Sequence, residues 1–498
     1  MTVWVLGDQL TTRVGPLADA DGDERVLMIE ARAFARRLPY HPQKLTLVFS
    51  AMRHFRDELR ERGYEVEYRR AETFGDALAD HFDDHPGDVL ALMRPASHGA
   101  GERLRELVDE AGGDVDLLEN DLFLLSPDEF DDWAGDRDRL RHGDFYRFVR
   151  RSTGYLMDGD DPVGGQWNYD EQNRETPPPN HEFPDPPSFE PDEQTRAVAA
   201  WADETFETWG DPEGFSWPVT RADAHRALDD FVERRLAEFG PYQDAMVADS
   251  WAGNHALLSP ALNLGLLHPR EVVERVVDAY DAGDAPLNSV EGVVRQVVGW
   301  REFVRHVYRR RMPAMSSANL LDATRDLPPL YYTGETDMRC LATVVDRVRD
   351  RGYSHHIERL MVLSNFALLY GADPHELDRW FHFAYVDAYH WVTTPNVVGM
   401  GSFATDALST KPYAASANYV DRMSDFCDDC RYDPDETTGD DACPFNALYW
   451  DFLAENEDRL RDDYRMGLSY HNLDRKDDLD AVRERAVDVR DRAAEEEL

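Results

Sequence analysis

The chain contains four cysteines in 498 residues, and three of them, Cys427, Cys430 and Cys443, fall within a short acidic stretch. The fourth, Cys340, lies far upstream and reaches the others only through folding. Thiolates bind zinc and iron–sulfur clusters, so four cysteines with none left over indicate a site with four sulfur ligands. Zinc ribbons usually use two CxxC pairs, and only Cys427 and Cys430 form one here. The spacing favours a [4Fe–4S] cluster over zinc, and unligated buried cysteines are the third interpretation.

Two adjacent histidines, His355 and His356, stand in the stretch SHHIERLM at the start of a predicted helix. Imidazole has a pKa of about 6.5, so either side chain can hold or release a proton near neutral pH. Judged by the residues alone, helix capping or a polar position in the core is the ordinary interpretation of such a pair.

These residues must be positioned by a chain that is too long for one simple core. The N-terminal part alternates between short apolar runs and amphipathic stretches, which predicts a parallel, Rossmann-like α/β domain over residues 1–125. Residues 126–220 are predicted to be an interdomain linker, proline-rich in part, and residues 221–498 a large all-helical domain. The predicted strands are Val3–Leu6, Val26–Ile29, Val66–Tyr68, Val89–Met93 and Val115–Leu118.

Acidic residues outnumber basic ones by 99 to 54, which gives a formal net charge of −45. The acids are spread along the chain, as on surfaces adapted to high salt. A local basic patch is still enough for nucleic-acid binding, and the densest arginine groups are Arg305–Arg311 and Phe145–Arg151. We expect no membrane span and no signal peptide, and therefore a cytoplasmic protein.

Several stretches resemble the photolyase/cryptochrome superfamily, in the order PVGGQWNYDEQNR, GWREF, SHHIERLM, KPYAASANY and CDDCRYDP with ACPFNALYWDF. They are most similar to its iron–sulfur branch, the bacterial and archaeal (6-4) photolyases and related cryptochromes. The resemblance covers nearly the whole chain. It implies FAD in the helical domain and a [4Fe–4S] cluster on Cys340, Cys427, Cys430 and Cys443. UV-damaged DNA is the implied partner, and we expect a monomer.

The resemblance also assigns roles to single residues. His356 matches the proton-donating histidine of the family, with His355 beside it. Arg359 and Asp387 match an arginine–aspartate pair next to the flavin ring. The positions that match flavin-contact segments are Leu258, Ser259, Gln296, Trp300 and Arg301.

Trp380 and Tyr389 match aromatic residues that carry electrons to the flavin in relatives. Tyr332 and Phe381 stand where close relatives can have Trp and Tyr. Because phenylalanine is a poor redox relay, we expect the photoreduction route of this chain to differ.

In relatives the sheet domain often holds an antenna chromophore of the ribityl-lumazine type. Gly7, Asp8, Gln9 and Glu30 lie where that pocket would be, the first three at the carboxyl edge of the first predicted strand. Phe34 stands where an acid can occur in relatives, which argues against such a pocket here.

Together these features predict a light-driven (6-4) photolyase. In such an enzyme a flipped-out lesion receives an electron from reduced FAD and a proton from a histidine. The alternative is a cryptochrome-like blue-light photoreceptor without repair activity. A light-independent DNA-binding protein with a structural cluster is a third interpretation, which flavin absorbance of the purified protein would exclude.

Overall fold

The computed structural model of the protein describes residues 1–498 except 19, 21, 23, 138 and 179. Five parallel strands form one sheet in the order β3-β2-β1-β4-β5. They are β1 (Thr2–Val5), β2 (Arg25–Ala31), β3 (Glu65–Ala71), β4 (Val89–Met93) and β5 (Asp114–Leu118). The predicted strands and the parallel, Rossmann-like sheet are therefore confirmed.

Helices cover both faces of this sheet. The alternation along β1 sends Val3 and Val5 to one face and Trp4 to the other. The first face packs with α2 (Pro42–Glu61) and α7 (Glu193–Thr205), and the second with α3 (Phe74–Asp84) and α4 (Ala100–Glu110). Burial on both faces explains why the central strands are nearly continuous apolar runs.

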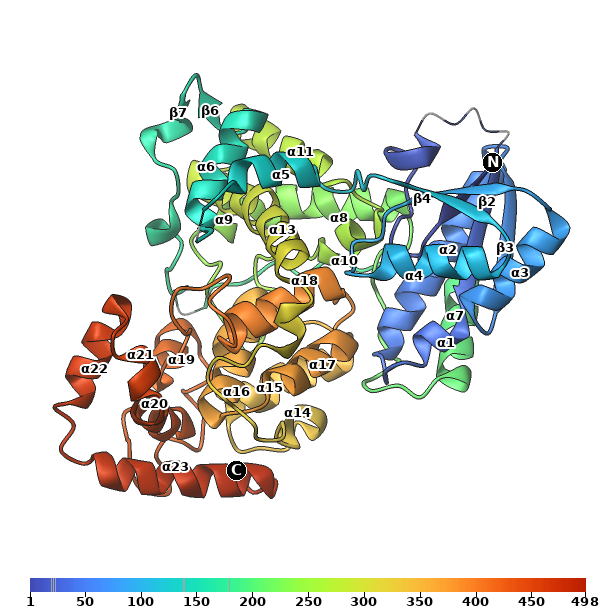
Figure 1. The fold of residues 1–498 in the computed structure, drawn as a ribbon. Helices are drawn as coiled ribbons and strands as arrows, with labels where there is room; N and C mark the ends of the chain where they lie inside the picture. The colour runs from blue at the N-terminus through green and yellow to red at the C-terminus, as the bar shows by residue number, and fades with distance from the viewer. Residues whose placement is uncertain (19, 21, 23, 138, 179) are drawn as a thin grey trace.

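The predicted linker contributes regular structure to both sides of the molecule. It contains α5 (Pro127–Ala134), α6 (His142–Thr153), the short hairpin of β6 (Met157–Asp158) and β7 (Asp161–Pro162), and α7. Figure 1 shows α5 and α6 on the helical side and α7 beside the sheet. The described residues between 174 and 192, the proline-rich part, form no helix or strand.

The remaining helices build the second domain, apart from α1 (Arg32–Ala35), which follows β2. They are α8 (Arg221–Arg234), α9 (Leu236–Phe239), α10 (Ser259–Leu264), α11 (Pro269–Ala282), α12 (Leu287–Val294), α13 (Glu302–Arg311), α14 (Leu330–Thr333), α15 (Arg339–Arg351), α16 (Asn365–Tyr370), α17 (Pro374–Ala384), α18 (His390–Thr394), α19 (Ala417–Met423), α20 (Pro444–Glu455), α21 (Glu457–Leu460), α22 (Gly467–Leu473) and α23 (Leu479–Ala494). Among the described residues, no helix is both long enough and apolar enough to cross a bilayer.

Three stretches of this domain wind as π-helix. They are η4 (Arg295–Arg301) between α12 and α13, η6 (Glu358–Ser364) before α16, and η7 (Pro395–Gly401) after α18. Such turns are uncommon and often occur at functional sites. Here η4 and η6 carry predicted flavin-contact residues, and η6 contacts η7.

The largest buried core runs without a break from the α2 face of the sheet into the helical domain. A smaller, separate cluster lies between the sheet and the pair α3 and α4. Shared apolar packing therefore joins the two domains on the α2 side, which is the side that faces the candidate site.

Candidate functional site

Ser259, Arg359 and Asp387 are far apart in the sequence and meet in one charged cluster. The Arg359 guanidinium binds both carboxylate oxygens of Asp387, at 3.1 and 3.0 Å. The Ser259 hydroxyl donates to Asp387 Oδ2 at 2.6 Å, and the Asn263 amide donates to Asp387 O at 2.9 Å. A forked, charge-assisted pair of this kind fixes the plane of the guanidinium. The cluster therefore ties α10, η6 and the loop before α18 together.

The sheet domain contributes Lys44 to the same place. Its buried amine donates to His382 O at 2.8 Å and to Ala388 O at 2.7 Å, directly beside Asp387. Burial lowers the pKa of Lys44 to about 7, against the opposing effect of the Asp387 carboxylate. Lys44 was not identified from the sequence. The available signal was that Lys44 is one of only three lysines in the chain and lies within the apolar stretch PQKLTLVF.

The paired histidines form a cluster with a third, His255. The ring of buried His355 stacks on His255, with centroids 4.5 Å apart and planes 11° from parallel. His356 meets His255 edge-on at 5.2 Å. Burial lowers the pKa of His355 and of His255 well below the usual value, and the neighbouring histidines add to both shifts. The stretch NHALLSP contains His255, but its sequence context alone did not reveal the stack.

His356 differs from its neighbours because 46% of its side chain is exposed, against 1% for His355. Its pKa is nevertheless lowered to about 4, mainly by burial and also by Arg359 and Arg295. His356 is thus the member of the histidine cluster that an incoming molecule would touch. We call His356, Gln296, Arg359 and Asp387 with their neighbours the His356 region.

Acidic groups lie around the imidazole of His356. Asp244 Oδ1 is 3.9 Å from His356 Nε2, and burial raises the pKa of Asp244 to about 6. Asp170 opposes the lowering of the His356 pKa, and it also pairs with Arg295 at 3.2 Å. Two carboxylates therefore lie near His356, and Asp170 is the one that favours protonation of its imidazole.

The segment η4 presents its predicted contact residues in different ways. Gln296 is half-buried and has no hydrogen-bond partner among the described residues. Trp300 stacks on His142 of α6, with centroids 3.8 Å apart. Arg301 pairs with buried Glu302 at 3.1 Å and its guanidinium lies 4.4 Å from the Phe123 ring centroid. The side chain of Gln296 remains available to a ligand, whereas that of Arg301 is occupied by protein groups.

The segment before α10 has an unusual backbone. Leu257 adopts a φ of 56°, a left-handed conformation that is rare for a branched side chain. It is followed by buried Leu258 and by Ser259, the first residue of α10. Such conformations cluster at functional sites, and this one directs the chain into the Asp387 cluster.

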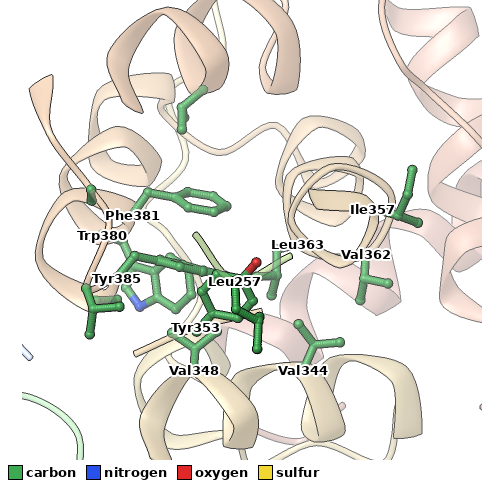
Figure 2. Packing of buried hydrophobic residues seen from close by; sticks show 14 of the residues in the cluster. Leu257, Val344, Val348, Tyr353, Ile357, Val362, Leu363, Trp380, Phe381 and Tyr385 are labelled. Atoms are coloured by element: carbon green, nitrogen blue, oxygen red, sulfur yellow. The ribbon is translucent and has the colours of Figure 1, made fainter. Parts of the chain in front are cut away.

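Trp380 lies inside a buried aromatic group (Figure 2). Its indole nitrogen donates to Tyr331 O at 2.9 Å. The ring of Tyr385 and the ring of Trp209 each lie 5.9 Å from it. Tyr385 in turn carries the Arg359 guanidinium 4.2 Å from its ring centroid. The order Tyr385, Trp380, Trp209 thus connects the Asp387 cluster to half-buried Trp209 near the surface.

The other aromatic positions lie off this line. Tyr332 is 41% exposed and stacks on Phe383 at 6.4 Å. Phe381 stacks on Tyr385 at 5.1 Å. Tyr389 lies near Lys44 rather than in the Trp380 group. Tyr385 and Trp209 were not singled out from the sequence. For Trp209 the only available signal was the presence of a tryptophan just after α7.

All four cysteines line one small cavity at the junction of α15, the loop after α19, and α20. Cys340 is the second residue of α15, and Cys443 precedes Pro444 at the start of α20. None of the four forms a disulfide bond. Burial raises the pKa of Cys340, the other three cysteines add to that shift, and burial raises the pKa of Cys427 to about 12. The remaining lining residues are Met338, Ala417, Val420, Phe426, Tyr432 and Phe445.

The acidic loop between Cys430 and Cys443 is held in place by Asn446. The Asn446 amide donates to Pro434 O at 2.8 Å and to Glu436 O at 2.7 Å. Its oxygen accepts a hydrogen bond from the Ala417 amide at 3.0 Å. The loop is therefore tied to α19 and α20, which explains how a strongly acidic stretch stays folded against the cysteines.

The comparison with known proteins places the chain in a family. Over 477 residues it is 43% identical to a (6-4) photolyase from Agrobacterium fabrum, and 94% of each chain is covered. Residues 3–217 also match the family described as deoxyribodipyrimidine photo-lyase-related protein. The chain belongs to the photolyase-related family.

Solved structures show the same fold. A class III photolyase from Agrobacterium tumefaciens superimposes with a TM-score of 0.60 at 16% identity, covering 85% of this chain and 83% of that one. A cryptochrome from Synechocystis sp. PCC6803 gives a TM-score of 0.59 at 14% identity, with 85% and 86% covered. The predicted photolyase/cryptochrome architecture is therefore confirmed.

The main arginine run of this photolyase-related protein is largely occupied by its own side chains. Arg305 is buried and its guanidinium lies 5.1 Å from the Phe123 ring centroid. Arg309 and Arg310 both bind Asp131, at 2.5 and 2.8 Å. Arg311 is exposed and has no ion-pair partner among the described residues. The structure therefore leaves Arg311, rather than the whole run, free for an external anion.

The second arginine group surrounds Trp167. The guanidinium of buried Arg150 donates to Trp167 O at 3.1 Å. Exposed Arg147 and Arg151 lie 5.8 and 4.8 Å from the centroid of the Trp167 ring. Their charges are therefore available at the surface of α6, next to a half-buried aromatic ring.

Two of the polar residues predicted for an antenna pocket, Gln9 and Glu30, are occupied by protein groups. Glu30 is 1% exposed and binds Arg53 at 2.8 and 3.1 Å. The Gln9 amide donates to Met93 O at 2.7 Å. Burial raises the pKa of Asp8 to about 6, and Phe34 is 51% exposed. A side chain built on Gly7 would meet Met52 at 3.0 Å, so the chain packs tightly at this strand end.

Proposed function

We propose that this protein is a light-driven (6-4) photolyase whose lesion site lies at His356. The observation that carries the proposal is the exposure of His356 next to the Arg359–Asp387 pair, within a cluster whose other histidines are buried. The 43% identity to a (6-4) photolyase over nearly the whole chain supports it. A bulky pyrimidine lesion cannot react inside a duplex, so the lesion must be flipped out to reach an accessible residue such as His356.

FAD is the cofactor that the family implies, and the residues of the cluster fit it. Ser259, Arg359, Asp387, Gln296 and Trp300 would hold the flavin, with Leu258 closing the apolar side. The Gln296 amide has no partner among the described residues and is free for a ligand, whereas the Arg359 guanidinium is fixed by Asp387 and Ser354 and would offer its charge. When bound and excited by light, reduced flavin supplies the electron for repair.

His356 would supply the proton. Its pKa of about 4 leaves the imidazole neutral at pH 7 in the free protein. A neutral imidazole is a poor acid, so proton donation requires a change of environment. Negative charge brought near by DNA phosphates raises a histidine pKa, and Asp170 already acts in that direction. We therefore expect His356 to become protonated when damaged DNA is bound, with His355 and His255 holding its ring.

The aromatic line Tyr385, Trp380 and Trp209 would carry electrons from the surface toward the flavin. The centroids of successive rings in this line are 5.9 Å apart, which is short enough for neighbouring rings to be in contact. Trp209 then takes the surface position that Tyr332 holds poorly, because Tyr332 touches Phe383 and not Trp380. Tyr389 stays a predicted relay without a ring partner in this line.

We also propose a [4Fe–4S] cluster on Cys340, Cys427, Cys430 and Cys443. Zinc with bonds to sulfur of about 2.3 Å draws its tetrahedral ligands to about 3.8 Å from one another. Among the described residues, no three cysteine sulfurs lie within 4.8 Å of one another. That spacing is wide for one zinc ion and suits a larger inorganic cage. The remaining lining is apolar or aromatic, so sulfur is the available ligand.

An antenna chromophore is left out of the proposal, because Glu30 and Gln9 already have protein partners. The proposal includes a cytoplasmic location, because the proposed substrate is cellular DNA, and a monomeric state. Arg147, Arg151 and Arg311 are the exposed cations that we expect to contact its phosphates.

Illumination with defined lesions tests the proposed activity. Purified protein is mixed with oligonucleotides that carry one (6-4) or one cyclobutane lesion, illuminated, and the products are separated by chromatography. We expect the wild type and the control variant His471→Ala, altered at an exposed histidine of α22, to restore (6-4) sites. His356→Ala should bind flavin and restore none. A wild type that binds flavin and restores neither lesion would favour the photoreceptor alternative.

Substitution of one ligand tests the cluster. Cys430→Ser should lower soluble yield, iron content and flavin content together, because the cavity joins α15, which contacts η6, to the C-terminal helices. Normal folding and normal flavin content without iron would contradict this structural role. Zinc in place of iron in the wild type would contradict the cluster itself.

A further inference from the structure

Three metal-binding side chains converge at the edge of the sheet, far from the cysteines. Glu67 lies on β3, the edge strand, and His81 and His85 lie on the last turn of α3 and just after it. The two histidines are four residues apart and so project from the same helix face. The capping box of Thr73 and Asp76 fixes the start of α3 and with it the register of this face.

The donor atoms are close enough to share one ion. His81 Nδ1 is 2.8 Å and His85 Nε2 is 3.4 Å from the same oxygen, Glu67 Oε2. One ligand atom from each of the three residues lies within 4.8 Å of the others. Zinc bonds of about 2.0–2.2 Å to nitrogen and oxygen place tetrahedral ligands about 3.3 Å apart. The observed separations lie on both sides of that value.

A simple hydrogen-bonded histidine does not account for this arrangement. An imidazolium at His81 between Glu67 and Asp88 would explain the contacts of His81 alone. It would not explain why His85 directs a second ring nitrogen at the same Glu67 oxygen. Two imidazoles and one carboxylate that converge on one point are the ligand set of a divalent transition metal.

The outer contacts have the pattern that orients metal ligands. The other nitrogen of buried His81, Nε2, makes no hydrogen bond and faces Asp88 Oδ2 at 3.3 Å. Asp88 is itself held by the N-terminal amine at 3.2 Å. The other oxygen of Glu67 accepts a hydrogen bond from Arg69, which also binds Asp84. A carboxylate behind a ligating histidine fixes its ring and increases its basicity.

We propose that Glu67, His81 and His85 form a divalent metal site of the zinc class, with water as the fourth ligand. His81 closes the buried side, while Glu67 and His85 keep 16% and 27% of their side chains exposed, which leaves room for the water. Imidazole ligands exclude Mg²⁺ and Ca²⁺ as the preferred ions. The ion would tie the end of α3 to the edge strand, and through Asp88 to the start of β4. The site is independent of the proposed repair activity.

Zinc binding to the full-length, chelator-washed protein tests the proposal. The zinc bound per chain is measured by equilibrium dialysis for the wild type, for His85→Gln and for His471→Gln. We expect the wild type and His471→Gln to bind one zinc ion more than His85→Gln. Asp88→Asn should keep the site with roughly tenfold weaker affinity, as for other outer contacts of metal ligands. Added zinc should raise the melting temperature of the wild type and not of His85→Gln.

X-ray absorption at the zinc edge separates this site from the cysteine cavity. We expect nitrogen and oxygen ligands with the scattering pattern of imidazole and no sulfur. A sulfur shell would assign the zinc to the cysteines and overturn the proposal. Equal zinc binding by the wild type and His85→Gln, or none by the wild type, would overturn it as well. Circular dichroism of each variant shows whether it is folded, and Glu67→Gln gives a second test if His85→Gln is not.

Discussion

The carboxyl edge of the sheet and the His356 region of the helical domain both carry polar residues at the predicted positions, but these residues have different contacts. At the sheet edge, Glu30 is paired with Arg53 and Gln9 with the Met93 carbonyl, while Asp8 has no hydrogen-bond or ion-pair partner among the other described residues. In the His356 region, Arg359 and Asp387 bind each other, but Gln296 has no partner among the described residues and His356 is 46% exposed. Polar groups that the fold already satisfies have less capacity left for a ligand. Gln296 and His356 are therefore the residues that make the His356 region the better candidate for ligand binding.

Matched substitutions of the two buried carboxylates give the largest expected contrast. Asp387→Asn leaves the half-buried Arg359, and Glu30→Gln leaves the buried Arg53, without its carboxylate partner. Each should reduce the free energy of unfolding by about 3–5 kcal/mol, as expected when one partner of a buried pair is removed. Only Asp387→Asn should also lose most of the bound flavin.

Flavin absorbance per chain and denaturant unfolding measure the two effects separately. As a control, the flavin content of the two variants is compared at denaturant concentrations at which both are folded and have equal stability. If Glu30→Gln loses as much flavin as Asp387→Asn, flavin content follows stability alone, and the distinction between the two regions does not hold.

The aromatic line gives the next effect. Trp380→Phe should nearly abolish photoreduction of the flavin by an external thiol, because it removes the ring between Tyr385 and Trp209. Trp209→Phe should slow it several-fold, and Tyr332→Phe should change it little. Transient absorption spectra of the wild type should show a tryptophan radical. In Trp209→Phe the lifetime of this radical should be shorter. Equal rates for Trp209→Phe and Tyr332→Phe would contradict the proposed surface end.

Much of the fold was predictable because its signals are local. Strand-length apolar runs separated by amphipathic helices determine the parallel sheet, and the predicted bounds of each strand lie within three residues of the observed ones. The cysteines and the His355–His356 pair were found because their types and spacing are rare. What local patterns could not predict is a partner that is distant in the sequence. Lys44 reaches Ala388 from another domain, and Asp131 binds two arginines that by themselves look like a DNA-binding patch.

The smallest effect is the pH dependence of stability, for which the two regions should differ in sign. The pKa of Asp8 at the sheet edge is raised by burial to about 6. The folded state therefore holds a proton that the unfolded state releases, and the stabilisation is present below about pH 4 and lost as the pH rises through about 6. The pKa of His356 in the helical domain is lowered, chiefly by burial, to about 4. Its contribution is present above about pH 6.5 and lost as the pH falls toward 4.

Unfolding of Asp8→Asn and His356→Gln between pH 4 and pH 7 measures the two contributions. As the pH falls from 7 to 4, the free energy of unfolding of Asp8→Asn should lack the gain that Asp8 gives the wild type. That of His356→Gln should lack the loss that His356 causes in the wild type. One titrating group changes the free energy of unfolding by at most about 1.4 kcal/mol per pH unit, and the exposure of His356 reduces its share. Slopes of the same sign for both variants would show that the two regions do not differ in this respect. The buried His355, whose pKa burial lowers well below its usual value, is a second probe of the His356 region, because solvent does not screen it.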